Sequence, residues 1–216
     1  MNLLTFAVVL GGWVFSLCLH EFSHALVAYY GGDTTVKDKG YLTFNPLKYT
    51  HPVFSLLIPI IFLLMGGIGL PGGAVYIEKW RLRDKRWETA VSLAGPFSNA
   101  VLALILGLIL QFGPVTGTGI WPGLAFLGLL QISAVVLNLI PLPPFDGYGA
   151  LEPHLPMTIR MKANEMRGML SWGVFLVLWY VPFVSSMFWN LIFFLSRLAG
   201  IPLQLAGLGL SQFKFS

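Results

Sequence analysis

Charged residues and cysteine are both scarce in this sequence, and each scarcity excludes a class of protein. Charged side chains make up only 10% of the 216 positions, whereas hydrophobic residues make up 56%. A mean hydropathy of +0.77 is far above the range of soluble domains, so a water-soluble globular protein is excluded. The single cysteine, Cys18, excludes a disulfide within the chain. We therefore expect an integral membrane protein that forms one compact helical bundle.

Five apolar segments are long enough to be considered as membrane spans. They are residues 3–30, 53–70, 89–112, 120–140 and 168–198. The last would be about 46 Å long as a helix, which is too long for one straight span, and Pro182 divides it. We expect either one tilted, kinked helix or two short helices there. The predicted fold class is an all-α polytopic membrane protein with about five to six transmembrane segments.

The basic residues predict how the segments are oriented. They fall in three stretches, whereas the connection 113–119 has none: Lys37, Lys39 and Lys48; Lys79, Arg81, Arg83, Lys85 and Arg86; Arg160, Lys162 and Arg167. If residues 53–70 enter and leave the membrane on one face, all three stretches lie on one side, which the positive-inside rule makes cytoplasmic. We favour such a re-entrant segment near residues 53–75 over a full span, which would separate the first stretch from the other two.

The sequence His20-Glu21-Phe22-Ser23-His24 interrupts the first apolar segment. A charged group within a span costs about 2 to 3 kcal/mol, so its default interpretation is functional. On a helix, His20 and His24 lie on one face, where their ring nitrogens can converge on one metal ion. Glu21 lies on the flank of that face and can take a proton from a water that the metal activates. Two core histidines that fall at this spacing by chance are the alternative.

A catalytic zinc typically has three protein ligands, and Asp146 is the candidate for the third. It follows an apolar span within the stretch N-L-I-P-L-P-P-F-D-G at residues 138–147. Three prolines prevent the helix from continuing, and Gly147 permits an irregular backbone that can turn the carboxylate back towards the membrane interior. The alternative is a solvated turn with an ordinary aspartate. We expect Glu152 and His154, which follow closely, to be solvated loop residues rather than groups that support the ligands.

Three motifs in this order resemble the site-2 protease family of intramembrane zinc metalloproteases: H-E-F-S-H at residues 20–24, G-P-F-S-N at 95–99, and the stretch at 138–147. The sequence looks most like the compact prokaryotic branch without PDZ or CBS domains, over roughly residues 1–155. The resemblance implies that His20, His24 and Asp146 bind one Zn²⁺ per chain. It also implies that Glu21 is the general base and that Asn138 lies near the active site.

Asn138 and Asn99 are candidates for holding the exposed backbone of an unwound substrate, with hydrogen bonds between helices of the bundle as the alternative for each. Gly95 is expected to permit close helix packing. Two stretches depart from the branch. After the residues N-P-L, its usual His and Asp are replaced by Tyr49 and His51, and the glycine-rich residues 66–75 also differ, so the mode of substrate presentation stays open.

The resemblance implies an intramembrane zinc endopeptidase that hydrolyses peptide bonds in or near transmembrane segments of other membrane proteins. We expect one domain over residues 1–216, with a catalytic core at about 1–155 and C-terminal helices at about 168–199 that flank the lateral entrance. The expected partners are a transmembrane protein substrate and the lipid bilayer, without nucleic acid; a regulatory membrane partner or a homo-oligomer stays open. The expected location is a prokaryotic cell membrane, with the active-site side cytoplasmic.

The alternative function is a metal-binding membrane protein without hydrolysis, such as a transporter or a sensor. Transporters usually line a path with polar residues at several depths, whereas the acids and histidines of this chain fall essentially in one cluster.

Overall fold

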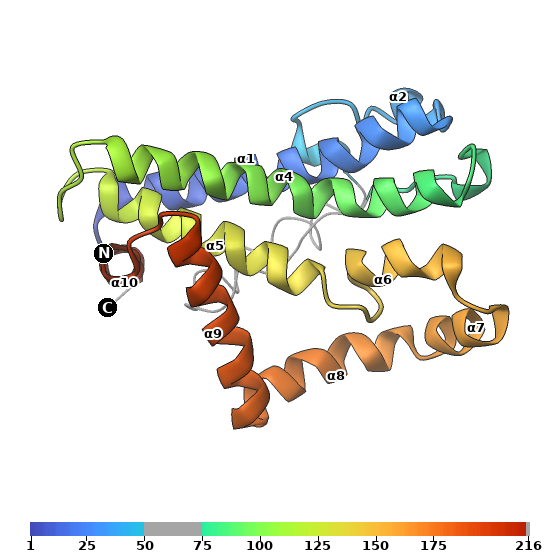
Figure 1. Ribbon diagram of the computed structural model, residues 1–216. Helices are drawn as coiled ribbons and strands as arrows, with labels where there is room; N and C mark the ends of the chain where they lie inside the picture. Colours follow the sequence, from blue (N-terminus) through green and yellow to red (C-terminus); the bar gives the residue numbers. More distant parts are fainter. Residues whose placement is uncertain (50–74, 215–216) are drawn as a thin grey trace.

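The computed structural model describes residues 1–49 and 75–214, and these residues form helices and connecting loops without a strand (Figure 1). The predicted all-α class is confirmed. Within the described part of the chain, three helices are long and apolar enough to cross a membrane, and a bent pair near the C-terminus makes a fourth candidate span. The expected re-entrant segment, His51 and nearly all of the glycine-rich stretch lie outside the described residues.

The three long helices are α1 (Leu3–Gly31), α4 (Lys85–Phe112) and α5 (Trp121–Asn138). They run side by side and pack against one another (Figure 1). Side chains just before two of these helices cap them: the Asn2 side chain accepts from two backbone N–H groups of α1, and Asp84 does the same for α4. Such caps satisfy amide groups that the first turn of a helix leaves without a partner.

Helix α5 is much shorter than the helix that precedes it. Its 18 residues reach about 27 Å, whereas the 28 residues of α4 reach about 42 Å. The two helices are joined at one end of the bundle, so α5 ends well before it has passed the full length of α4. The short helix α6 (Asp146–Leu151) then packs against α4.

The backbone is irregular over residues 139–145, as the three prolines predict, and Asp146 is the first residue of α6. Gly147, expected to permit the irregular backbone, lies within this helix. Gly147 serves close packing instead, because a Cβ atom there would overlap the carbonyl oxygen of Leu139 at the end of α5. The missing side chain brings the start of α6 against the end of α5 and thereby places Asp146.

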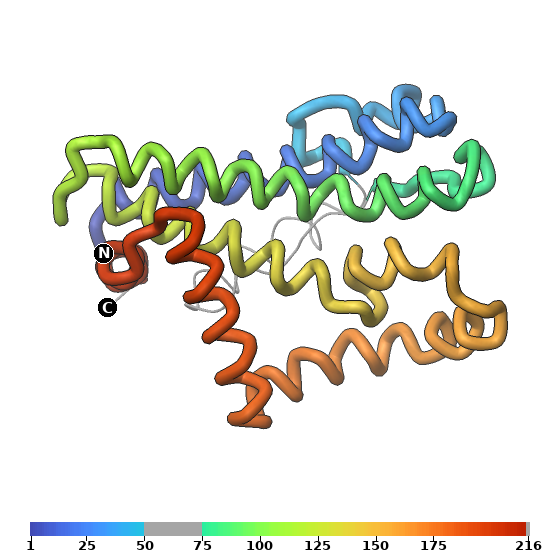
Figure 2. Tube along the Cα trace, viewed as in Figure 1, coloured from blue at the N-terminus to red at the C-terminus, as the bar shows by residue number. Residues whose placement is uncertain are grey.

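The C-terminal part consists of η4 (Glu152–His154), α7 (Met157–Glu165), α8 (Arg167–Tyr180), α9 (Pro182–Leu198) and α10 (Leu203–Phe213). Helices α8 and α9 meet at an angle of 90° directly before Pro182, which confirms that the last apolar segment is divided there. Helix α10 is not among the predicted elements; it packs against α5 and α1. Phe213 of α10 stacks on Phe6, and Figure 2 shows α10 close to the start of α1.

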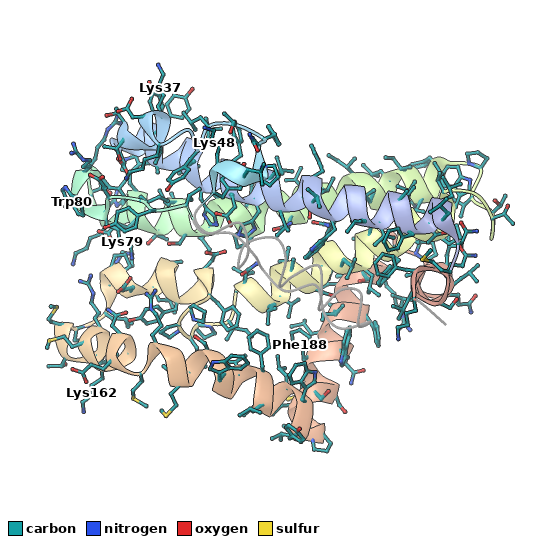
Figure 3. All side chains as sticks on the ribbon, turned by 180° about the vertical axis from the view of Figure 1, so that it is seen from behind. Lys37, Lys48, Lys79, Trp80, Lys162 and Phe188 are labelled. Carbon is teal, nitrogen blue, oxygen red and sulfur yellow. The ribbon has the colours of Figure 1, made fainter. Side chains whose placement is uncertain are left out.

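Among the described residues between α1 and α4 are the short helices α2 (Thr35–Asp38), η1 (Pro46–Lys48) and η3 (Lys79–Arg81). Lys37, Lys79 and Lys162 lie at the same end of the bundle (Figure 3), and the uncharged connection 113–119 lies at the other end. Basic residues from all three predicted stretches therefore gather at one end.

Candidate metal centre

His20, Glu21 and His24 lie in α1, and Asp146 lies at the start of α6. One ligand atom from each of His20, His24 and Asp146 lies within 4.8 Å of the other two. The Oδ2 atom of Asp146 is 3.2 Å from Nε2 of His20 and 3.5 Å from Nε2 of His24. The two Nε2 atoms are 3.0 Å apart. The structure thus brings together the three residues that the sequence predicts as metal ligands.

The other ring nitrogen of each histidine faces an oxygen atom of α4. Nδ1 of His24 is 2.6 Å from the carbonyl oxygen of Val91, and Nδ1 of His20 is 2.6 Å from Oδ1 of Asn99. A carbonyl oxygen only accepts hydrogen bonds, so Nδ1 carries the proton in each ring. In the neutral imidazole, Nε2 is then left with a lone pair. Protein ligands of zinc are commonly held in this way.

The arrangement fits a cation. In the neutral rings two Nε2 lone pairs and a carboxylate oxygen converge, and Oδ2 of Asp146 is buried without a hydrogen-bond partner in the described part of the chain. A buried acceptor without a partner is costly. Two imidazole nitrogens and one carboxylate are also a donor set found at catalytic zinc sites, which keep a further position open.

One face of α4 supports both histidines. Val91, Gly95 and Asn99 are spaced four residues apart, so they line up along the helix. Val91 and Asn99 accept the two Nδ1–H bonds, and Gly95 lies between them. A Cβ atom on Gly95 would overlap the rings of both His20 and His24. This agrees with the expectation that Gly95 serves close helix packing.

Glu21 is buried, with 4% of its surface exposed. Its Oε2 accepts a hydrogen bond of 3.0 Å from the backbone N–H of Val75, in the non-helical residues 75–78 that lead to η3. Such a bond fixes the carboxylate beside the two histidines. No feature of the sequence marks Val75 as part of the site, because the backbone of any residue other than proline supplies this donor.

A cavity of about 540 Å³ opens in front of these side chains. Besides the four residues of the site, it is lined by Asn138 at the end of α5, by Lys79 and by Arg167. Asn138 is therefore near the site, as the resemblance implies. Asn99 lies behind His20, where its Oδ1 faces the His20 ring and its Nδ2 donates to Gln131. These contacts favour a role for Asn99 in holding His20.

Glu152 and His154, which follow Asp146 closely in the sequence, differ in burial. Glu152 is buried and forms an ion pair with Lys79, so the expectation of a solvated loop residue is wrong for it. His154 is exposed and lies 3.0 Å from the hydroxyl of Thr89. The basic stretch that contains Lys79 could have indicated a buried Glu152, because Lys79 supplies its charge partner.

Tyr49, which stands where the branch usually has histidine, is buried against α1. Its hydroxyl donates to the carbonyl oxygen of Thr43 and lies 3.2 Å from that of Cys18. Tyr49 therefore holds the loop that follows α2 against the first span.

Known proteins resemble the chain over most of its length. "Putative zinc metalloprotease Rip2" of Mycolicibacterium smegmatis is 47% identical over 208 residues, which cover 94% of this chain and 78% of the relative. The protein of the same name in Mycobacterium tuberculosis H37Rv is 45% identical over 207 residues, with the same coverage. "Putative zinc metalloprotease YwhC" of Bacillus subtilis is 35% identical over 193 residues, 83% of each chain. No family model matches the chain, and no solved structure is significantly similar to it.

A His-His-Asp group with both histidines buried, within a bundle of apolar helices, together with these relatives, defines a membrane-embedded zinc metalloprotease. The chain belongs to the site-2 protease family, in the compact branch that its three motifs indicate.

Proposed function

We propose that this protein is an intramembrane zinc endopeptidase that cleaves peptide bonds in or near the transmembrane segments of other membrane proteins. The observation that carries the proposal is the convergence of three possible ligand atoms beside the buried carboxylate of Glu21, within helices that are apolar enough to span a membrane. His20, His24 and Asp146 hold one Zn²⁺. The ion, when bound, polarises the scissile carbonyl and makes water more acidic.

Glu21 accepts a proton from the attacking water and later delivers it to the leaving amine. The hydrogen bond from Val75 holds the carboxylate in place for both transfers. Asn138, on the wall of the cavity, offers an amide to the backbone of the substrate. A transmembrane substrate must unwind locally to expose a peptide bond, and its freed backbone groups need such partners in a site that holds little water.

We further propose that the protein lies in a prokaryotic cell membrane with the basic end in the cytoplasm. Lys37, Lys79 and Lys162 gather at that end (Figure 3), and the positive-inside rule favours the cytoplasmic side for it. Lys79 and Arg167 also line the cavity, so the site opens towards the same end. Substrate would enter laterally from the lipid bilayer, beside the C-terminal helices.

A test compares wild type with Glu21→Gln and Asp146→Ala in detergent, with zinc content and cleavage of a model transmembrane peptide measured on the same samples. We expect about one zinc per chain in wild type and in Glu21→Gln, and less in Asp146→Ala. Loss of the general base should lower the cleavage rate by roughly 10² to 10⁴-fold. Asp38→Asn, which removes a carboxylate from α2, is the matched control and should change neither quantity.

The experiment also separates the proposal from its alternative. Zinc in wild type without cleavage of any peptide tested would favour a metal-binding transporter or sensor. Absence of zinc from monodisperse wild-type protein would overturn the metal site itself.

A further inference from the structure

Gln131 stands out because it is a fully buried polar residue in the middle of a membrane-spanning helix. It lies in α5, and its exposed fraction is 0%. A buried amide in a membrane is costly unless its polar atoms find partners. Its Oε1 accepts a hydrogen bond of 2.8 Å from Nδ2 of Asn99. Its Nε2 has no partner among the described residues.

This contact extends the hydrogen bonds of the metal centre by one step. Nδ1–H of His20 donates to Oδ1 of Asn99, and Nδ2 of the same amide donates to Gln131. All protons in this chain point from His20 towards α5. The direction matters because it leaves the lone pair of the His20 ring on Nε2, the atom that faces Asp146.

The same positions of nitrogen and oxygen atoms also allow the reverse direction. An Asn99 amide that is turned over presents its NH₂ group to Nδ1 of His20, and the ring proton then resides on Nε2. An Nε2 atom that carries a proton cannot bind a metal ion. The orientation of one amide therefore decides whether His20 is a ligand.

We propose that Gln131 is a positioning residue that keeps the Asn99 amide in the metal-binding orientation. In that orientation the NH₂ group of Asn99 needs an acceptor, which Gln131 supplies. Without it, a buried donor would be left without a partner, and turning the amide over would satisfy that donor with Nδ1 of His20. With the amide turned over, the proton on Nε2 of His20 also has an acceptor in Oδ2 of Asp146, 3.2 Å away, so loss of Gln131 favours the orientation that cannot bind metal.

The inference rests on the proposed zinc site, and zinc affinity tests it. Affinity is measured by competition with a chromophoric chelator on monodisperse protein in detergent. Gln131→Leu removes the acceptor at similar volume, and we expect zinc to bind about tenfold more weakly, as for other residues that support metal ligands. Gln131→Glu keeps an acceptor oxygen in either protonation state and should retain the affinity of wild type.

A double substitution distinguishes positioning from a general role in holding the bundle together. Because Gln131 acts through Asn99, Gln131→Leu should have little further effect on zinc affinity in an Asn99→Leu background. Ser133→Ala is the matched control, since the Ser133 hydroxyl is also buried on α5 but donates to Leu129 of the same helix. It should bind zinc like wild type.

Equal zinc affinity in wild type and Gln131→Leu would overturn this inference and leave the proposed function intact. Absence of zinc from wild type would overturn the proposed function itself. If Gln131→Leu does not fold, Gln131→Met provides the same comparison, and ¹⁵N NMR of the His20 ring reports the proton position directly. A proton on Nε2 of His20 in zinc-loaded wild type would contradict the proposed orientation.

Discussion

Three residues of α4, each four positions from the next, hold the two histidines of α1 by different means. Val91 contributes only its backbone carbonyl oxygen, Asn99 contributes a side-chain oxygen, and Gly95 contributes the absence of a side chain. The first two fix the position of the ring protons. The glycine fixes the distance between the helices. Only the asparagine acts through chemistry that its side chain carries.

Gly95→Ala should therefore disable the site without a change in any ligand. Its methyl group would overlap both imidazole rings, which must then move away from Asp146. We expect Gly95→Ala to bind zinc about 10 to 100-fold more weakly and to lose cleavage activity in proportion. Zinc content and peptide cleavage measure the two effects.

Gly11→Ala is the matched control for this substitution. Gly11 lies in α1, and a Cβ atom there would meet no other atom within 4 Å. Alanine favours a helix over glycine by about 1 kcal/mol, so the control should be as active and as stable as wild type or slightly more stable. Normal zinc affinity in Gly95→Ala would show that the helices can separate enough to accommodate a methyl group.

The sequence predicts the residues of the site better than it predicts what supports them. His20, Glu21, His24 and Asp146 are identified by charge in apolar surroundings and by helical spacing. The Val91 carbonyl and the Val75 amide belong to the backbone, which leaves no trace in residue type. Gln131 does have a signal, since it is an amide within an apolar segment, but its partner on α4 depends on how the helices pack.

At the scale of elements, the segment before η3 is held to the loop after α1 by a group of charges around Glu78. Lys39 and Arg81 donate to the two carboxylate oxygens of Glu78, and the Glu78 backbone N–H donates to Asp33. Three residues upstream, Val75 donates to Glu21. The anchor at Glu78 therefore positions the segment that holds the general base.

Glu78→Gln should weaken this anchor while leaving the metal ligands in place. We expect lower cleavage activity, by severalfold, with zinc content unchanged, because the substituted residue lies outside the metal centre. Glu165→Gln removes the same charge from α7 and should leave cleavage unchanged. Equal activity in Glu78→Gln and wild type would mean that Val75 is held well enough without the ion pairs.

The stability difference between wild type and Glu78→Gln should also depend on pH. Hydrogen bonds from Lys39, then from Arg81, lower the pKa of Glu78 to about 2, from its ordinary value of 4.5. A carboxyl group whose pKa is lower in the folded protein stabilises the folded state at a pH above its ordinary pKa. This contribution is lost as the pH falls towards the pKa in the folded protein. The difference in melting temperature between wild type and Glu78→Gln should therefore be constant above about pH 4.5 and shrink below it.

The sequence predicts the long helices better than the short ones, because only a long apolar run is recognisable as a span. The long spans and the division at Pro182 follow from apolar runs and from proline chemistry. Helices α6, α7 and α10 have 6, 9 and 11 residues, each too short to be recognised as a span. α10 is held by its packing on α5 and α1, which only the folded chain reveals.

At the scale of the whole molecule, charge differs sharply between the two ends. Eleven of the 13 basic residues belong to the three stretches identified in the sequence. The exceptions are Arg197 and Lys214. Arg197 precedes the turn that packs against Gly107 of α4, and Lys214 follows Phe213, which stacks near the start of α1. Both therefore lie towards the end opposite the metal centre.

This asymmetry predicts the orientation in the membrane, which cysteine labelling in intact cells can measure. In a Cys18→Ser background, Thr116→Cys lies in the uncharged connection and should react with a membrane-impermeant maleimide from outside. Lys162→Cys lies at the basic end and should react only after the membrane is opened. The reverse pattern would contradict the cytoplasmic assignment, and both positions are exposed, so burial does not interfere.

The position of His20 along α1 also fixes the depth of the metal centre below the end of that helix. About eleven residues separate His20 from the end of α1, so the centre lies about 16 Å below that end. An extended polypeptide covers this distance with about five residues, whereas a helix would need all eleven. If the protein is the endopeptidase proposed above, a substrate cut at this depth would leave a stub whose length depends on the position of the metal centre and on the degree of unwinding.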